Sequence, residues 1–236
     1  MDRTRVLITG ATGYIGRRLK DKLLHYPELQ VRIFVRNVLK VQEKARQQVE
    51  IVEGDTFDKE KLAQALENID VAFDLIHSMG AEGDFSDLDR KSAENFRDAC
   101  IAAGVRKIIY LGGLGVKDTA SEHLLSRIET GEVLSARQDR IVTIWIRAGV
   151  IIGAGSKSFE ILRNLTQKLP VMVTPRWVTT RTQPIAVDDV LAYLTASIWL
   201  ETGENIIVDI GADTTSFRDM MLSAARVMGL RRFVFP

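Results

Sequence analysis

The stretch Val6-Leu7-Ile8-Thr9-Gly10-Ala11-Thr12-Gly13-Tyr14-Ile15-Gly16 decides the fold. Its first three residues form a continuous apolar run, which is typical of a strand buried on both faces. Three glycines follow at three-residue spacing, and the next segment places Leu19 and Leu23 at helical spacing before Pro27. A strand, a glycine turn and a helix in this order predict a dinucleotide-binding turn.

Each glycine has a distinct physical role in such a turn. Gly10 lets the chain leave the strand sharply, Gly13 removes a side chain where the backbone meets a pyrophosphate, and Gly16 lets the helix pack on the strand. The first helical turn points free N–H groups and the positive end of its dipole at the phosphates. We therefore expect the dinucleotide to contact Gly10, Thr12, Gly13, Tyr14 and Ile15.

The same stretch resembles the T-G-x-x-G-x-x-G turn of the extended and atypical short-chain dehydrogenase/reductases at every fixed position. Over nearly the whole chain, the residues resemble the atypical NmrA-like and YbjT-like NAD(P)-binding proteins, which are often labelled nucleoside-diphosphate-sugar epimerases. That label says little about chemistry, because one fold hosts many reactions. Longer relatives carry a further C-terminal domain, and the apolar end at Phe233-Val234-Phe235-Pro236 fits the N-terminal part of a longer protein.

Composition narrows the class of protein. The 236 residues are 46% hydrophobic and 27% charged, which suits one α/β domain with a substantial core. The net charge of +1 gives no basic field for nucleic acid. Cys100 is the only cysteine, which excludes an intrachain disulfide and a multi-cysteine metal site, and we expect no metal. Without a signal peptide or a membrane-spanning apolar run, we expect a cytoplasmic protein.

Strand and helix patterns alternate along the first 150 residues or so. This alternation predicts a doubly wound α/β fold, the Rossmann fold, with about seven mostly parallel strands. We expect residues 1–155 to form the NAD(P)-binding core. Residues 156–236 should complete the sheet and roof the cleft within the same structural domain. Because ligands bind at the carboxyl ends of such strands, the residues that follow each strand are the ones to examine.

Arg36 follows the second expected strand, where NAD-preferring proteins usually place a carboxylate for the ribose hydroxyls. A guanidinium there matches a 2′-phosphate in charge and geometry, so we expect NADP(H), with NAD as the alternative. A solvated surface arginine is the other interpretation. After the third strand, Asp55 and Thr56 lie where the family holds the adenine, although Asp55 could equally serve only to turn the chain.

Ile76, His77 and Ser78 follow the fourth strand, at a position that lies beside the ribose and nicotinamide in the relatives. A histidine there could transfer protons. A lone histidine at a strand end more often makes structural hydrogen bonds, so we expect these residues to contact the cofactor rather than to catalyse.

The expected catalytic position departs from the family. Active relatives place a Ser or Thr after the fifth strand and a Tyr and a Lys four residues apart on the next helix. Here the strand ends in glycines, and the matching helical pair is His123 and Arg127. Arginine does not deprotonate, so Arg127 could hold a ribose or phosphate oxygen but not act as a base, whereas His123 could exchange protons. A tyrosine-based mechanism is therefore not expected.

In the last third, the resemblance places Ala148 and Val150 at the nicotinamide amide. Residues 170–184, with Trp177 between arginines, could roof a pocket for an aromatic or anionic ligand or could form a solvated loop. An aspartate at 188 or 189 is expected to cap the following helix, and Met220 and Met221 are expected to fill the core.

Two classes of function remain open from the sequence. One is an NADP-dependent oxidoreductase or epimerase with an unusual proton donor, acting on an unknown small molecule. The other is a non-catalytic module that senses the redox state of NADP(H) and passes it to a protein partner or to a further C-terminal domain.

Overall fold

The computed structural model describes residues 3–76 and 85–235. The chain forms two compact units. The first comprises Met1–Arg147 with Leu191–Asp209, and the second comprises Ala148–Val190 with Ile210–Pro236. The division expected between residues 155 and 156 stays a prediction.

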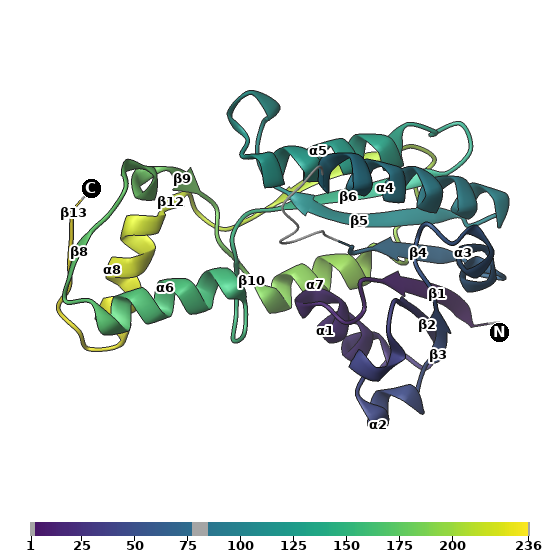
Figure 1. Cartoon of the computed structure of the whole chain (residues 1–236), viewed down its shortest axis with the longest axis horizontal. Helices are drawn as coiled ribbons and strands as arrows, with labels where there is room; N and C mark the ends of the chain where they lie inside the picture. The colour runs from purple at the N-terminus through teal and green to yellow at the C-terminus, as the bar shows by residue number, and fades with distance from the viewer. Residues whose placement is uncertain (1–2, 77–84, 236) are drawn as a thin grey trace. The chain divides into compact units, whose positions relative to one another are not determined.

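A seven-stranded sheet forms the centre of the first unit, in the order β11-β6-β5-β4-β1-β2-β3 (Figure 1). The pairs β1–β2, β2–β3, β1–β4 and β4–β5 are all parallel. The strands are β1 (Thr4–Thr9), β2 (Leu29–Val35), β3 (Glu50–Glu53), β4 (Val71–Asp74), β5 (Lys107–Gly113), β6 (Val142–Ala148) and β11 (Ile206–Ile210). The predicted doubly wound α/β fold is therefore confirmed.

Helices cover both faces of this sheet (Figure 1). On one face α3 (Lys59–Leu66), α4 (Phe85–Ala102) and α5 (Glu122–Ser135) pack against alternate residues of the strands. The other face carries α1 (Tyr14–Leu23), with Leu19 and Leu23 fully buried, and the Leu191–Ala196 part of α7 (Val187–Ala196). Shorter elements between β2 and β3 are η1 (Val38–Lys40) and α2 (Glu43–Arg46), and η2 (Lys117–Thr119) precedes α5.

Capping residues explain several of the helix boundaries. Asp58, Ser121 and Ser216 each precede a helix, and each side chain accepts a hydrogen bond from a backbone N–H of the first turn. The expectation of a capping aspartate before α7 is wrong. Because β10 (Ile185–Ala186) runs directly into this helix, Asp188 and Asp189 lie inside its first turn and favour its dipole instead.

The second unit contains α6 (Lys157–Lys168) and α8 (Phe217–Val227), three two-stranded sheets and one short 3₁₀ helix. Its paired strands are β7 (Ile151–Ile152) with β10, β9 (Arg181–Thr182) with β12 (Thr215–Ser216), and β8 (Val171–Val173) with β13 (Phe233–Phe235). Met172, Met220, Met221 and Val234 lie in its core, so the methionines fill space as expected.

Candidate dinucleotide site

The turn after β1 has the geometry that its glycines predict. Gly10 adopts a φ of 64°, and a Cβ on it would lie 2.3 Å from the Leu75 carbonyl oxygen. A Cβ on Gly16 would lie 2.3 Å from the Gly10 carbonyl oxygen, so α1 packs directly on the turn. Gly13 precedes the helix, which has no side-chain cap and no acidic residue in its first turn. This end of α1 is therefore suited to an anion.

Tyr14 opens α1 and packs beneath the guanidinium of Arg18, which lies 4.1 Å from the centre of its ring. The Tyr14 hydroxyl is buried and makes no hydrogen bond with the described residues. Ile15 follows, half-buried. Thr12 lies in the turn itself, and contact of Gly10, Thr12, Gly13, Tyr14 and Ile15 with a dinucleotide stays a prediction.

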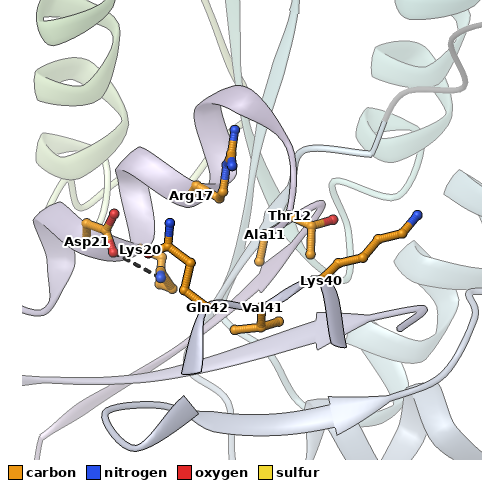
Figure 2. Close-up of a pocket in the computed structure, with 8 residues that line it drawn as sticks. All are labelled: Ala11, Thr12, Arg17, Lys20, Asp21, Lys40, Val41 and Gln42. Carbon is orange, nitrogen blue, oxygen red and sulfur yellow. Dashed lines mark ion pairs between the residues drawn. The ribbon is translucent and has the colours of Figure 1, made fainter. Parts of the chain in front are cut away.

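A small pocket lies beside the turn, between α1 and the segment after β2 (Figure 2). It is lined by Ala11, Thr12, Arg17, Lys20, Asp21, Lys40, Val41 and Gln42. Lys20 is only 4% exposed and pairs with Asp21 at 2.9 Å, while the Arg17 and Lys40 side chains extend away from that pair. Three cations against one carboxylate make this pocket suited to an anionic group.

Arg36 is exposed at the end of β2, and it does not line this pocket. Asn37 follows it, and the Asn37 side-chain oxygen accepts the Leu39 N–H at 2.8 Å to begin η1. This short helix carries Lys40 to the pocket wall. Arg17, Lys20 and Lys40 were not predicted from the sequence; the cations on α1 and on the segment after β2 were the pattern that could have revealed them.

Asp55 and Thr56 form the turn between β3 and α3. The Asp55 carboxylate accepts a hydrogen bond from the Phe57 N–H at 3.1 Å, so Asp55 does help to form the turn. Thr56 is buried, and its hydroxyl lies 2.8 Å from the Ser92 hydroxyl of α4. A contact of either residue with adenine stays a prediction.

Thr9 and Asp74 join the end of β1 to the end of β4. The Thr9 hydroxyl lies 3.0 Å from both the Phe73 carbonyl oxygen and Asp74 Oδ1, and it accepts the Leu75 N–H at 3.2 Å. Asp74 Oδ1 also accepts the Ile76 N–H at 3.2 Å. Burial raises the pKa of Asp74 to about 6, although the hydrogen bonds from Ile76 and Thr9 lower it. Neither residue was singled out from the sequence, because their bonding partners lie far away along the chain.

Ile76 is the last residue described at the end of β4. His77 and Ser78 lie outside the described residues. Their predicted contacts with the cofactor therefore stay predictions.

The end of β5 is filled by a side chain from α5. A Cβ on Gly113 would lie 2.6 Å from Leu124 Cδ1, and a Cβ on Gly115 would lie 2.5 Å from Leu124 Cδ2. The Trp145 indole occupies the corresponding space at Gly112, where a Cβ would lie 2.5 Å from its Nε1. No described side chain at this strand end offers the hydroxyl that active relatives place there.

His123 and Arg127 lie one turn apart on α5 in different surroundings. His123 is exposed, whereas Arg127 is half-buried, and its guanidinium would lie 3.8 Å from a Cβ on Gly113. Burial lowers the pKa of Arg127, and the attraction of Asp89 opposes this. The Tyr110 hydroxyl donates to the Arg127 carbonyl oxygen at 2.9 Å, which fixes α5 against β5.

Ala148 and Val150 belong to the second unit. Ala148 is buried at the end of β6, and the Val150 carbonyl oxygen accepts the Ile185 N–H at 2.9 Å. Their contact with a nicotinamide stays a prediction. Among residues 3–76 and 85–235 no cluster of metal-ligating side chains occurs, and none of the helices described there could span a membrane.

Comparisons with known proteins agree with this geometry. Residues 10–141 match a family described as NAD(P)H-binding, so the chain belongs to that NAD(P)H-binding family. A (4-alkanoyl-5-oxo-2,5-dihydrofuran-3-yl)methyl phosphate reductase of Streptomyces griseus is 27% identical over 178 residues, covering 72% of this chain. The match spans only 59% of that reductase.

Solved structures confirm the fold. A nucleoside-diphosphate-sugar epimerase of Staphylococcus aureus matches 100% of this chain and 80% of its own, with a TM-score of 0.80 at 20% identity. A UDP-glucuronic acid 4-epimerase of Bacillus cereus, in complex with UDP-glucuronic acid and NAD, matches 98% of this chain and 85% of its own. Its TM-score is 0.78 at 15% identity. The chain thus has the same fold as these two epimerases.

Proposed function

We propose that the chain is an NADP(H)-dependent oxidoreductase of the atypical NmrA-like and YbjT-like kind, and that it works without the Tyr and Lys pair. The glycine turn carries this proposal, because its three glycines and its uncapped helix leave room for a pyrophosphate. The reductase among its relatives supports hydride transfer as the type of reaction.

The preference for NADP(H) rests on the cations around the turn. Arg36 follows β2 with no acidic residue next to it in the sequence, and Lys40 and Arg17 line the neighbouring pocket. These side chains would hold the 2′-phosphate that distinguishes NADP(H) from NAD(H). Charge-assisted hydrogen bonds of this kind contribute about 1.5–3 kcal/mol each, which is roughly tenfold or more in affinity.

Titration of the protein with NADPH and NADH tests this preference. We expect Arg36→Ala and Lys40→Ala to weaken NADPH binding about tenfold or more and to leave NADH binding nearly unchanged. Lys59→Ala, an exposed lysine of α3, serves as the control for general charge effects. Equal affinity for both dinucleotides, unaltered in both variants, would contradict the proposed NADP(H) preference.

His123 is the proposed proton donor of the reaction, and Arg127 is proposed to hold a ribose or phosphate oxygen. His123→Ala should then lower turnover by about 10²–10⁴-fold with the affinity for NADPH retained, as loss of a general acid does. Arg127→Ala should instead weaken NADPH binding, and Glu122→Ala is the matched exposed control on the same turn. Unchanged turnover in His123→Ala would remove this histidine from the mechanism.

A second candidate is a redox-sensing NADP(H) module without catalysis. The position of Leu124 favours this sensor, because its side chain fills the end of β5, where a catalytic hydroxyl would lie. NADPH consumption against carbonyl compounds, quinones, nucleotide sugars and acyl-dihydrofuranone phosphates separates the two. Turnover with any class supports the enzyme, whereas no turnover together with different affinities for NADP⁺ and NADPH supports the sensor.

A further inference from the structure

Thr9, Asp74 and Tyr110 lie side by side on three adjacent strands, on the sheet face that α3, α4 and α5 cover. Asp74 pairs with Tyr110 in the β4–β5 register, and the β1–β4 register ends at Ile8 and Phe73, the residues directly before Thr9 and Asp74. The carboxyl group of Asp74 is 4% exposed, directly beneath the turn that Gly10 begins. Gly10 itself packs on the Leu75 peptide, so the carboxyl group belongs to the support of the glycine turn.

The hydrogen bonds of Thr9 connect Asp74 to the residue that directly precedes the glycine turn. The Thr9 hydroxyl has one hydrogen, yet two oxygens lie 3.0 Å from it, the Phe73 carbonyl and Asp74 Oδ1. When Asp74 is ionised, Thr9 can donate its hydrogen to only one of these oxygens, and Oδ1 also accepts the Ile76 N–H. When Oδ1 carries a proton, Asp74 can donate to Thr9 while Thr9 donates to Phe73, so Asp74 and Thr9 can be hydrogen-bonded in both protonation states.

We propose that Asp74 takes up a proton when the anionic dinucleotide binds to the glycine turn, so that Asp74 and Thr9 form a proton-coupled positioning site. This inference rests on the proposed dinucleotide binding. A negative charge buried beneath the turn repels the pyrophosphate, and a neutral carboxyl group does not. By reciprocity, bound dinucleotide favours the protonated form by the same factor as protonation favours binding.

The described groups around Asp74 indicate that Asp74 is the one among them that changes its protonation state near neutral pH. Asp89 of α4 raises its pKa, and the Ile76 N–H and the Thr9 hydroxyl, neither of them a cation, lower it. Cys100 of α4 and Tyr110 of β5 also face it, and burial raises the pKa of both of them. Arg127 of α5 acts on Tyr110. Of Asp74, Cys100 and Tyr110, Asp74 therefore has the pKa nearest to neutral, at about 6.

Calorimetry of NADH binding in two buffers of different ionisation enthalpy counts the protons taken up. NADH is the probe because the 2′-phosphate of NADPH would itself titrate at a pKa of about 6. A coupling of roughly tenfold predicts about half a proton per NADH near pH 6.5, and an NADH affinity that falls roughly tenfold from pH 5 to pH 8. Asp74→Asn should abolish both effects, and Asp139→Asn, an exposed aspartate after α5, should keep both.

Thr9 variants decide the question even where Asp74→Asn folds poorly. The Thr9 hydroxyl lowers the pKa of Asp74, so Thr9→Val should move the greatest proton uptake to higher pH, and Thr9→Ser should leave it in place. NADH binding without proton uptake, or uptake that persists in Asp74→Asn, overturns this inference alone. If the protein binds neither NADH nor NADPH, the proposed function and this inference are both overturned.

Discussion

Glycines end two strands of the same sheet, β1 and β5, and serve opposite purposes there. At β1 they leave room for backbone, because a Cβ built on Gly10 or on Gly16 would lie only 2.3 Å from a backbone carbonyl oxygen. At β5 they leave room for side chains, because Gly113 and Gly115 accommodate Leu124. The first arrangement leaves the start of α1 without a side-chain cap, and the second fills the end of β5 with an apolar side chain. Identical residues at equivalent strand ends therefore say nothing alone about function.

Gly10→Ala should give the largest effect at the β1 end. Gly10 has a positive φ, and an added Cβ would clash with the Leu75 carbonyl, which is backbone and cannot move aside. We therefore expect the substitution to lower the free energy of unfolding by more than about 3 kcal/mol. Denaturant unfolding and NADPH titration measure the loss of stability and of binding.

Gly104→Ala is the matched control for this substitution. Gly104 also has a positive φ, of 72°, but nothing lies within 4 Å of a Cβ there. The backbone strain alone should cost about 1 kcal/mol. Equal costs at both glycines would show that close packing on the Leu75 carbonyl is unimportant.

Gly113→Ser should show a smaller effect at the β5 end, because the obstacle there is the flexible end of Leu124. We expect a destabilisation of about 1–3 kcal/mol from overpacking. In the double variant with Leu124→Ala, a favourable coupling of about 1 kcal/mol or more should appear in a double-mutant cycle. Additive costs would mean that Leu124 does not fill this strand end.

Asp74→Asn should stabilise the fold by up to about 3 kcal/mol at pH 7.5, since Asp74 has a pKa of about 6 when folded and 3.8 in the reference state. The folded protein binds more protons between these values, so ionisation of Asp74 destabilises it as the pH rises. This cost is absent below about pH 4 and complete above about pH 6. Unfolding at pH 4 and pH 7.5 checks the sign, and an equal difference at both would contradict it.

A gain in stability combined with a loss of proton-coupled binding would mark Asp74 as functional. Residues kept at a cost in stability are expected at binding sites rather than in structural cores. The β4 end would then join the β1 turn as part of the dinucleotide site, in contrast to the closed end of β5.

The amino-acid sequence by itself determined the fold and the glycine turn. The alternating strand and helix patterns and the glycine spacing were readable because each depends on residues a few positions apart. The capping aspartate before α7 was predicted wrongly, because the preceding β10 strand leaves no turn there for a cap.

Only the tertiary structure decided what surrounds the site. Thr9 and Asp74 are 65 residues apart, and Arg17 and Lys40 reach one pocket from separate elements. Leu124 fills the end of β5 from the following helix. No local pattern encodes these contacts, because side chains distant in sequence meet only when the strands and helices pack. Burial then sets the charge state of Asp74, which its neighbours along the chain do not reveal.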